Sequence, residues 1–323
     1  LEWSGQPLGN LDLKLQRNAD YWAGTLDCAV AKGRLQIPKS LEANNKIKLE
    51  MEQIDLSSLL KLNLPKPTST SASAPAQPVT KKLPLFEINS EKLLFRGSEL
   101  GKLAIDSERI GQGIKFKHFT VTAKEQTLSL TGDWQVQNNQ EITRLNGQLI
   151  AEHFGELLAK LNLNDDLEET DAQINLALHW TGAPYQFSLA TLSGSMDIKL
   201  EGGRISSVEP GIGRLLGVLA MEQWLKRLQL DFGDIYKKGL SLNEVTGHFT
   251  LNNGKATTNN LTVDAVPATI RLTGELNLPE QTLDQQISVI PKSSDALPIA
   301  GTIVGGIATV VAETLTGEYE EGY

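Results

Sequence analysis

The side chains that could carry out catalysis or bind a metal are scattered along the sequence. The histidines stand far apart, at His118, His153, His179 and His248, and none has a second ligand at i+4 or a carboxylate at metal-ligand spacing. The single cysteine, Cys28, excludes an internal disulfide framework and a cysteine-rich zinc site. We therefore expect no catalytic residue, no metal and no cofactor.

Two further segments resemble ligand-binding motifs, but each lacks an essential feature. The acidic run NDDLEETD at 164–171 has no turn glycine of the kind that a calcium loop needs, so we interpret it as a solvated loop. In GIGRLLG at 211–217 the third glycine comes one position late for a dinucleotide-binding turn, and Pro210 interrupts any strand leading into it. The sequence therefore predicts a protein that is not an enzyme and that binds no nucleotide.

Composition narrows the class of protein further. Hydrophobic residues make up 40% and charged residues 21% of the 323 positions, which is typical of a soluble globular fold. The net charge of −9, with no basic run interleaved with aromatics, argues against a nucleic-acid partner. The longest apolar stretch, residues 299–312, is shorter than the ~20 residues that a membrane-spanning helix needs.

The elements that remain to carry a function are repeated strands. A seven-residue pattern with Gly at its third position and large apolar residues at its first and fifth positions occurs six times. The copies are WAGTLDC at 22–28, LTGDWQV at 130–136, LNGQLIA at 145–151, LSGSMDI at 192–198, VTGHFTL at 245–251 and LTGELNL at 272–278. Alternation predicts a strand with one apolar and one polar face. The glycine on the apolar face indicates a bulge, a bend, or close approach of a ligand or neighbouring backbone.

A longer repeat contains the short one. Segments 3–8 and 23–35 resemble segments 180–185 and 193–205. A third pair of matching segments occurs in a different order in the two halves, so we expect the chain to begin partway through a repeat unit of a longer, repetitive protein.

The sequence predicts three regions. Residues 1–64 are expected to be the end of one repeat unit, residues 65–82 a flexible linker rich in Pro, Ser and Thr, and residues 83–323 a C-terminal unit. Turn residues recur about every 8–15 positions beyond the linker, which favours an antiparallel, mainly β fold. Short helices are expected at Leu56–Leu62 and Phe154–Leu161, where leucines follow helical spacing.

Two apolar segments near the C-terminus are expected to close the sheet or approach a membrane. The first is an amphipathic helix at 211–228, whose apolar face would consist of Ile212, Leu215, Leu216, Leu219, Trp224, Leu225 and Leu228. The second is the tail at 297–317, which carries glycines at GxxxG spacing and either forms a buried hairpin or helix or docks at a membrane interface. Its apolar residues are Ile299, Ile303, Val304, Ile307, Val310 and Val311.

The pattern alone leaves open how the strands hide their apolar faces. Sheet-on-sheet packing, closure of the sheet, and a groove filled by an apolar ligand all satisfy it. Large units in tandem favour an extended, repetitive body.

The run from 192 to 311 resembles the C-terminal region of the YhdP family of AsmA-like proteins. The resemblance is carried by the GR strand at 203–204, PGIGRLLG at 210–217, LQLDFGD at 228–234, KGLSL at 238–242, NGKATTNNL at 253–261 and PIAGTIVGGIATVV at 298–311. The chain departs from the family pattern after Val311, where it ends in ETLTGEYEEGY. The earlier repeats fit the family more loosely.

The resemblance implies a mainly β fold in which an elongated, twisted antiparallel sheet forms an open apolar groove, with few helices. It implies transport of phospholipids between the inner and outer membranes of a Gram-negative bacterium through the periplasm. The full-length protein would be anchored in the inner membrane by an upstream helix, with its C-terminus toward the outer membrane, and would maintain the outer-membrane permeability barrier.

Acyl chains would lie along the apolar face of the repeated strands. The groove residues would be Leu26, Leu130, Trp134, Val136, Leu145, Leu149, Leu192, Met196, Ile198, Val245, Phe249, Leu251, Leu272, Leu276 and Leu278. One alternative is a structural or assembly module of the envelope, a β-solenoid with a dry core that binds protein partners. Another is an enzyme acting on envelope glycans, which only a fold-level analogy supports.

Overall fold

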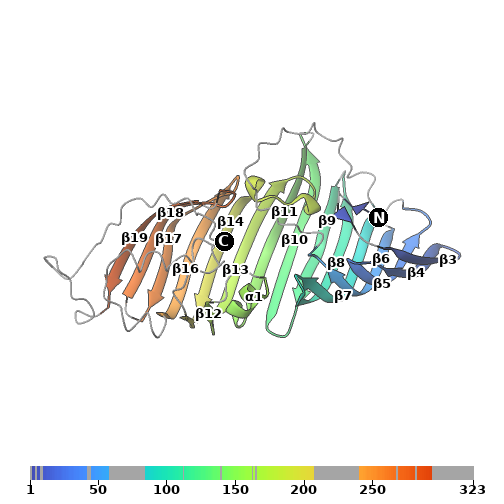
Figure 1. Cartoon of the computed structure of the whole chain (residues 1–323). Coiled ribbons are helices and arrows are strands. Elements are labelled where there is room, and N and C mark those ends of the chain that lie inside the picture. Colours follow the sequence, from blue (N-terminus) through green and yellow to red (C-terminus); the bar gives the residue numbers. More distant parts are fainter. Residues whose placement is uncertain are drawn as a thin grey trace. The chain divides into compact units, whose positions relative to one another are not determined.

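The computed structural model consists mostly of strands (Figure 1). The chain divides into two compact units: unit 1 comprises Leu1–Leu149 and Leu176–Ser188, and unit 2 comprises Ile150–Asn175 and Leu189–Tyr323. The residues that the structure describes are 2–3, 6–7, 10–41, 45–57, 84–111, 113–138, 140–161, 163, 166–206, 240–266, 268–280 and 282–292.

Unit 1 is a sheet in which neighbours in sequence pair with one another. From β3 to β10 each strand pairs with the next, and every pair is antiparallel except β6 with β7. A separate two-stranded sheet joins β1 to β2. The elements are β1 (Glu2–Trp3), β2 (Gln6–Pro7), β3 (Asp12–Arg17), β4 (Tyr21–Asp27), β5 (Ala31–Pro38), β6 (Lys46–Asp55), β7 (Leu85–Phe95), β8 (Ser98–Ile110), β9 (Gly113–Thr122), β10 (Gln126–Gln137), most of β11 (Gln140–Ala151), the second half of β13 (Asp171–Thr181) and the 3-10 turn η2 (Pro184–Gln186).

In unit 2 the strands pair antiparallel in the order β14, β16, β17, β18, β19. The short strands β12 and β15 pair with each other, and β15 also pairs with the start of β16. The elements are α1 (Phe154–Lys160), β12 (Leu167–Glu168), the first half of β13, the 3-10 turn η3 (Leu189–Thr191), β14 (Ser193–Glu201), β15 (Arg204–Ile205), β16 (Leu240–Asn252), β17 (Lys255–Ala265), β18 (Ala268–Asn277) and β19 (Thr282–Pro291).

The sequence-based prediction of a mainly β fold with an open antiparallel sheet and few helices is confirmed. The six copies of the glycine pattern lie, to within one residue at their ends, in β4, β10, β11, β14, β16 and β18. The helix expected at Phe154–Leu161 is α1. The linker at 65–82, the helix at 211–228, the tail at 297–317 and all but the first two residues of Leu56–Leu62 lie outside the described residues. Leu56 and Ser57 form a turn.

Local sequence explains the hairpins and their register. β16 and β17 are joined by the two residues Asn253 and Gly254, both with positive φ (48° and 81°), which suits the right-handed twist of the flanking strands. Along β17 the buried side changes from even positions to odd positions at the register shift between Thr258 and Leu261. The bulge therefore keeps both halves of the strand facing the same apolar side.

The glycines of the repeat allow neighbouring backbones to approach closely. A Cβ added at Gly24 would overlap the carbonyl oxygen of Lys14 on β3, and one added at Gly132 would overlap that of Arg144 on β11. Gly132 also flanks a register shift between β9 and β10. Close approach of a neighbouring backbone is therefore what these two positions require, out of the alternatives that the sequence left open.

The parallel pairing of β6 with β7 was not foreseen. Their register is constant from Lys46 opposite Leu85 to Met51 opposite Ser90, and Ile54 lies opposite Leu93. The sheet of unit 1 therefore continues on both sides of the segment predicted to be a linker. The proposed division into residues 1–64, 65–82 and 83–323 stays a prediction.

We predict that Gly132→Ala lowers the free energy of unfolding by about 1–3 kcal/mol, because the new methyl group meets backbone that can move only with its strand. Gly247→Ala is the comparison, because its nearest obstacle is the Leu261 side chain, with Cδ1 at 2.8 Å. Urea denaturation measures both, and an equal loss in the two variants would contradict this account of the glycine pattern.

Candidate functional site

The apolar face of unit 1 is organised into two rows that cross its strands. Residues directly opposite each other in a sheet share a face, so the register fixes the members of each row. Row A is Leu15, Gly24, Leu35, Leu49, Ile88, Ile105, Phe119 and Leu130, one residue from each of β3 to β10. Row B is Leu13, Leu26, Gly33, Met51, Ser90, Leu103, Val121 and Leu128 from the same strands.

The two rows differ in burial, since row A is mostly half-buried whereas five of the eight residues of row B are buried. In row A, Leu35 and Leu130 are buried, whereas Leu49, Ile88, Ile105 and Phe119 are half-buried. The cluster around Leu93, Leu103 and Val121 draws all its members from β6 to β10 and the turn after β6. The described core of this region is thus formed by neighbours on one sheet face.

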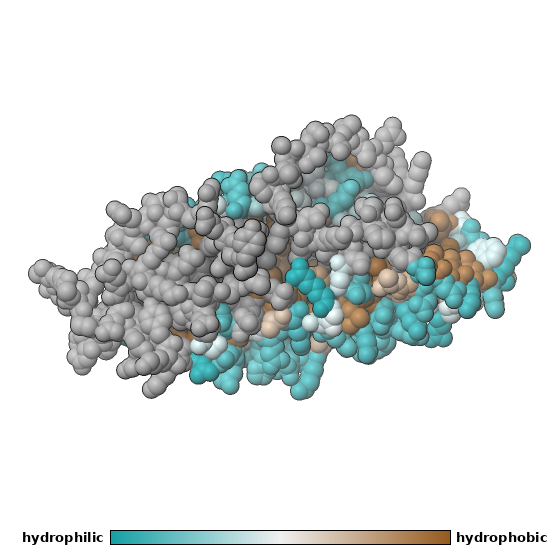
Figure 2. Space-filling view, in the orientation of Figure 1, coloured by the Kyte–Doolittle hydropathy of each residue, from teal (hydrophilic) through white to brown (hydrophobic). Residues whose placement is uncertain are grey.

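Exposure is greatest where the rows reach β3. Leu13 is 44% exposed and Leu15 39% exposed, although both point to the apolar face. Trp22 on β4 shares this face and is 39% exposed, whereas Tyr21 points to the opposite face. Figure 2 shows hydrophobic surface next to hydrophilic surface over the first strands of unit 1. Exposed apolar side chains gathered on one face are typical of a site that binds a protein, a membrane or an apolar ligand.

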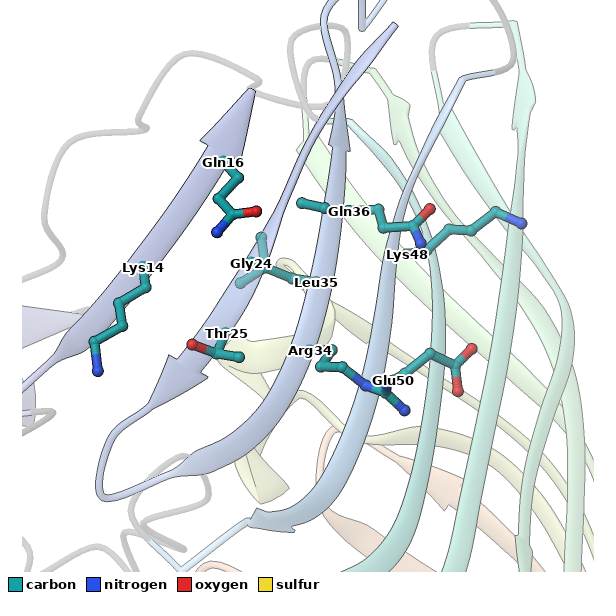
Figure 3. Close-up of a pocket in the computed structure, with 10 residues that line it drawn as sticks. Lys14, Gln16, Gly24, Thr25, Arg34, Leu35, Gln36, Lys48 and Glu50 are labelled. Atoms are coloured by element: carbon teal, nitrogen blue, oxygen red, sulfur yellow. The ribbon is translucent and has the colours of Figure 1, made fainter. Parts of the chain in front are cut away.

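The opposite face of the same strands is polar. Lys14, Thr25, Arg34, Glu50 and Asn89 lie opposite one another in succession on β3 to β7. Asn89 donates a hydrogen bond from Nδ2 to Oε1 of Glu50 at 2.9 Å. Figure 3 shows Arg34 beside Glu50 in a hollow of this face that Lys14, Gln16, Gln36 and Lys48 also line. The lining carries both signs of charge and therefore has no evident preference for a cation or an anion.

A strap crosses the apolar face of unit 1 near the end of β10. Its residues, 182–187, are held by hydrogen bonds from Gly182 N to Glu141 O (2.7 Å) and from Thr143 Oγ1 to Gly182 O (2.8 Å). Ala183 is fully buried in a cluster with Leu85, Ile114, Phe116 and Trp134. Ile105 packs against this cluster and also against the cluster around Leu93, Leu103 and Val121. The apolar face is therefore continuous from the rows to the strap.

Unit 2 has the same alternation with a more completely buried apolar face. Its rows include Leu200–Val245–Val263–Ile270 and Leu261–Leu272–Ile287. Leu261 and Leu272 are 0% exposed, and the other five are 2–5% exposed. A polar break in this face consists of Thr258 and Gln285 on either side of Gly274. The side chains of these two rows are buried as completely as those of a protein core.

The polar face of unit 2 carries exposed ion pairs. Lys255 Nζ lies 2.8 Å from Glu275 Oε1, and this hydrogen bond raises the pKa of Lys255. The hydrogen bond from Lys292 is the largest cause that lowers the pKa of Asp264, followed by that from Asn243. Exposed pairs of this kind contribute little to stability, so this face mainly provides solubility.

The structure brings the predicted groove residues together in two places. In unit 1, Leu26 and Leu130 belong to rows B and A, Trp134 and Leu145 pack together near the strap, and Val136 and Leu149 are half-buried on β10 and β11. In unit 2, Met196 lies opposite Phe249 and Ile198 opposite Gly247. Val245, Leu251, Leu272 and Leu276 belong to the buried face, Leu192 precedes β14 and is buried, and Leu278 follows β18 and is half-buried. Whether any of them contacts a ligand stays a prediction.

Sequence reasoning missed most of the central residues of the rows. Leu35, Leu49, Ile88, Ile105 and Phe119 lie on β5 to β9, which carry no copy of the glycine pattern. Alternation in KIKLEMEQID on β6 was a usable signal. The predicted helix residues 212–228 and tail residues 299–311 lie outside the described residues. Within the described ranges there is no group of three or more His, Cys, Asp or Glu side chains that could hold a metal, and no helix long and apolar enough to cross a membrane.

Comparison with known proteins places the chain in one group. The sequence model of the family described as "YhdP protein" matches residues 1–317. The chain is 23% identical over 239 residues to "Intermembrane phospholipid transporter YhdP" of Escherichia coli (strain K12). The match covers 72% of the chain and 19% of that relative, so the chain spans a small part of the length of the relative. No solved structure matches.

We predict that Leu261→Ala in unit 2 lowers the free energy of unfolding by about 3–4 kcal/mol, because it leaves a cavity in a filled region. The matched variant Leu49→Ala in row A is expected to cost about 1–2 kcal/mol, because that side chain is half-buried. Urea denaturation of the two variants measures the difference. Equal losses would show that row A is as tightly covered as the core of unit 2.

Proposed function

The chain belongs to the YhdP protein family, and on that premise we propose that rows A and B bind the acyl chains of phospholipids while these lipids move between membranes. The observation that carries the proposal is row A, which crosses eight strands and in which Leu49, Ile88, Ile105 and Phe119 are half-buried.

The geometry of the rows suits acyl chains. Seven spacings of ~4.8 Å between eight strands give a row about 34 Å long, while one leaflet of a ~30 Å hydrocarbon core is about 15 Å thick. Each row is therefore long enough for acyl chains to lie end to end. Each methylene removed from water contributes about 0.8 kcal/mol, so a lipid is held without any reactive side chain. Similar apolar residues from strand to strand give a lipid similar contacts at each step along the row.

We place this activity in a longer protein. The curated relative is described as an intermembrane phospholipid transporter, and we propose the same role here: an inner-membrane protein that bridges the periplasm toward the outer membrane and maintains its permeability barrier. The partners would be phospholipids and the two membranes. We propose that the chain has no enzymatic activity, since binding and exchange require none.

The alternative function, a scaffold with a dry core that binds envelope proteins, is supported by unit 2. The side chains of its central rows are almost entirely buried, and a filled face leaves no room for an acyl chain. Native mass spectrometry of the purified chain separates the two possibilities. Co-purifying phospholipid supports the transport proposal, and a chain that carries no lipid and takes none from vesicles supports the scaffold.

We predict that Leu49→Glu weakens phospholipid binding by about 15-fold, because a carboxylate in row A excludes about two methylenes from contact. Binding of a fluorescent phospholipid to the purified chain measures the loss. Leu49 is preferable to the fully buried Phe249 (2% exposed), where a charge would disrupt the fold.

Gln36→Glu is the matched control for this variant. It adds the same charge on the neighbouring strand β5, at an exposed position of the polar face opposite Lys48. It is expected to bind phospholipid as the wild type does. Equal weakening in both variants would assign the effect to charge alone and would count against binding along row A.

A further inference from the structure

One buried polar group on the apolar face of unit 1 has no partner among the residues that the structure describes. The indole of Trp134 is 3% exposed, and its Nε1 makes no hydrogen bond to any of these residues. Buried donors in folded proteins are almost always paired, and leaving one unpaired destabilises the fold. The unpaired N–H of Trp134 therefore offers a ligand on this face a hydrogen-bond donor.

The neighbouring tryptophan shows that the strap can satisfy an indole. Trp180 is also buried, and its Nε1 donates a hydrogen bond to the carbonyl oxygen of Ala183 at 3.1 Å. Trp180 on β13 and Trp134 on β10 thus both contact Ala183 of the strap, but among the described residues only the N–H of Trp180 has a partner.

The strap residue in ring contact with Trp134 is an exposed one. Tyr185 meets Trp134 edge to face, with ring centroids 6.1 Å apart and planes at 85°, and it is 45% exposed. Gly182 and Ala183 of the strap are held by hydrogen bonds through their backbone atoms. Burial, and secondarily Glu141, raises the pKa of Tyr185, so the phenol stays neutral.

We propose that the Nε1–H of Trp134 donates a hydrogen bond to the ester carbonyl oxygen of an acylglycerol lipid bound on the apolar face. This inference rests on the proposed function and adds a recognition point to it. The acyl chain leads from the carbonyl past Ile105, which packs against both clusters, to row A. Trp134 thereby fixes where the polar end of the lipid meets the strap.

The apolar surroundings of the indole favour a carbonyl over a phosphate. Leu85, Ile114, Phe116 and Ala183 pack in one cluster with Trp134. Burying a phosphate anion among such side chains costs far more than burying a neutral ester, because the anion loses far more hydration. The phosphate therefore stays in water while the carbonyl reaches the indole.

The test compares two phospholipids that differ only in the linkage of their chains. One is a diacyl phosphatidylglycerol, and the other is its dialkyl ether analogue, which keeps the phosphate and lacks the carbonyls. We expect the wild-type chain to bind the diester about fivefold more tightly than the diether, the contribution of one neutral hydrogen bond. Trp134→Phe is expected to bind both lipids at the level of the diether.

Trp180→Phe is the matched control, since it removes a buried indole N–H that already has a protein partner. It is expected to keep the fivefold preference for the diester. If Trp134→Phe keeps that preference, or loses affinity equally for both lipids, the proposal is overturned. If the wild type binds neither lipid, the proposed function fails with it; if the wild type binds both lipids equally, only the carbonyl contact fails.

A second measurement, by NMR, uses the wild-type chain alone. The indole N–H resonance of Trp134 in the wild-type chain is expected to shift downfield on addition of the diester and to move less with the diether. Equal shifts with the two lipids would overturn the assignment to the carbonyl.

Discussion

The architecture depends on the hydrogen-bond register between neighbouring strands. A slip of one residue would send every apolar side chain of a strand to the polar face. Rows A and B lie where the register from β3 to β10 is regular, and the register shifts of these strands fall just beyond the rows. At Gly24 and Gly132 neighbouring carbonyl oxygens leave no space for a side chain, so glycine allows the backbones to approach there.

Apolar and polar residues alternate along the strands of both units, but the apolar face is buried to a different extent in each. In unit 2 the cross-strand rows are filled and buried, so they behave as a core. In unit 1 the rows have neighbours on the same sheet face but remain half-covered toward β3. Strand pattern alone does not distinguish a core from a binding face, because both require one apolar side. A core and a binding face differ in how completely the apolar side is buried, and only the tertiary structure specifies that burial.

The sequence predicted the local structure well and the long-range structure poorly. The glycine pattern identified strands, and leucine spacing identified α1, because both signals depend on neighbours in the chain. The parallel pairing of β6 with β7 joins residues 39 positions apart, and no local pattern encodes it. Row residues such as Leu49 and Ile88 were missed because their strands lack the glycine. The unpaired N–H of Trp134 depends on the strap from residues 182–187, which lie far from it in sequence.

The parallel junction also sets an order of folding events. Antiparallel hairpins such as β3–β4–β5–β6 and β7–β8–β9–β10 close through short connections, and each forms from contacts close in sequence. Joining β6 to β7 closes the segment 56–84, which costs about 2 kcal/mol more in chain entropy than closing a hairpin. We therefore expect the meanders β3–β6 and β7–β10 to form early and to dock against each other late. Until they dock, β6 and β7 both present unpaired edges, which makes this seam the step most exposed to aggregation during synthesis.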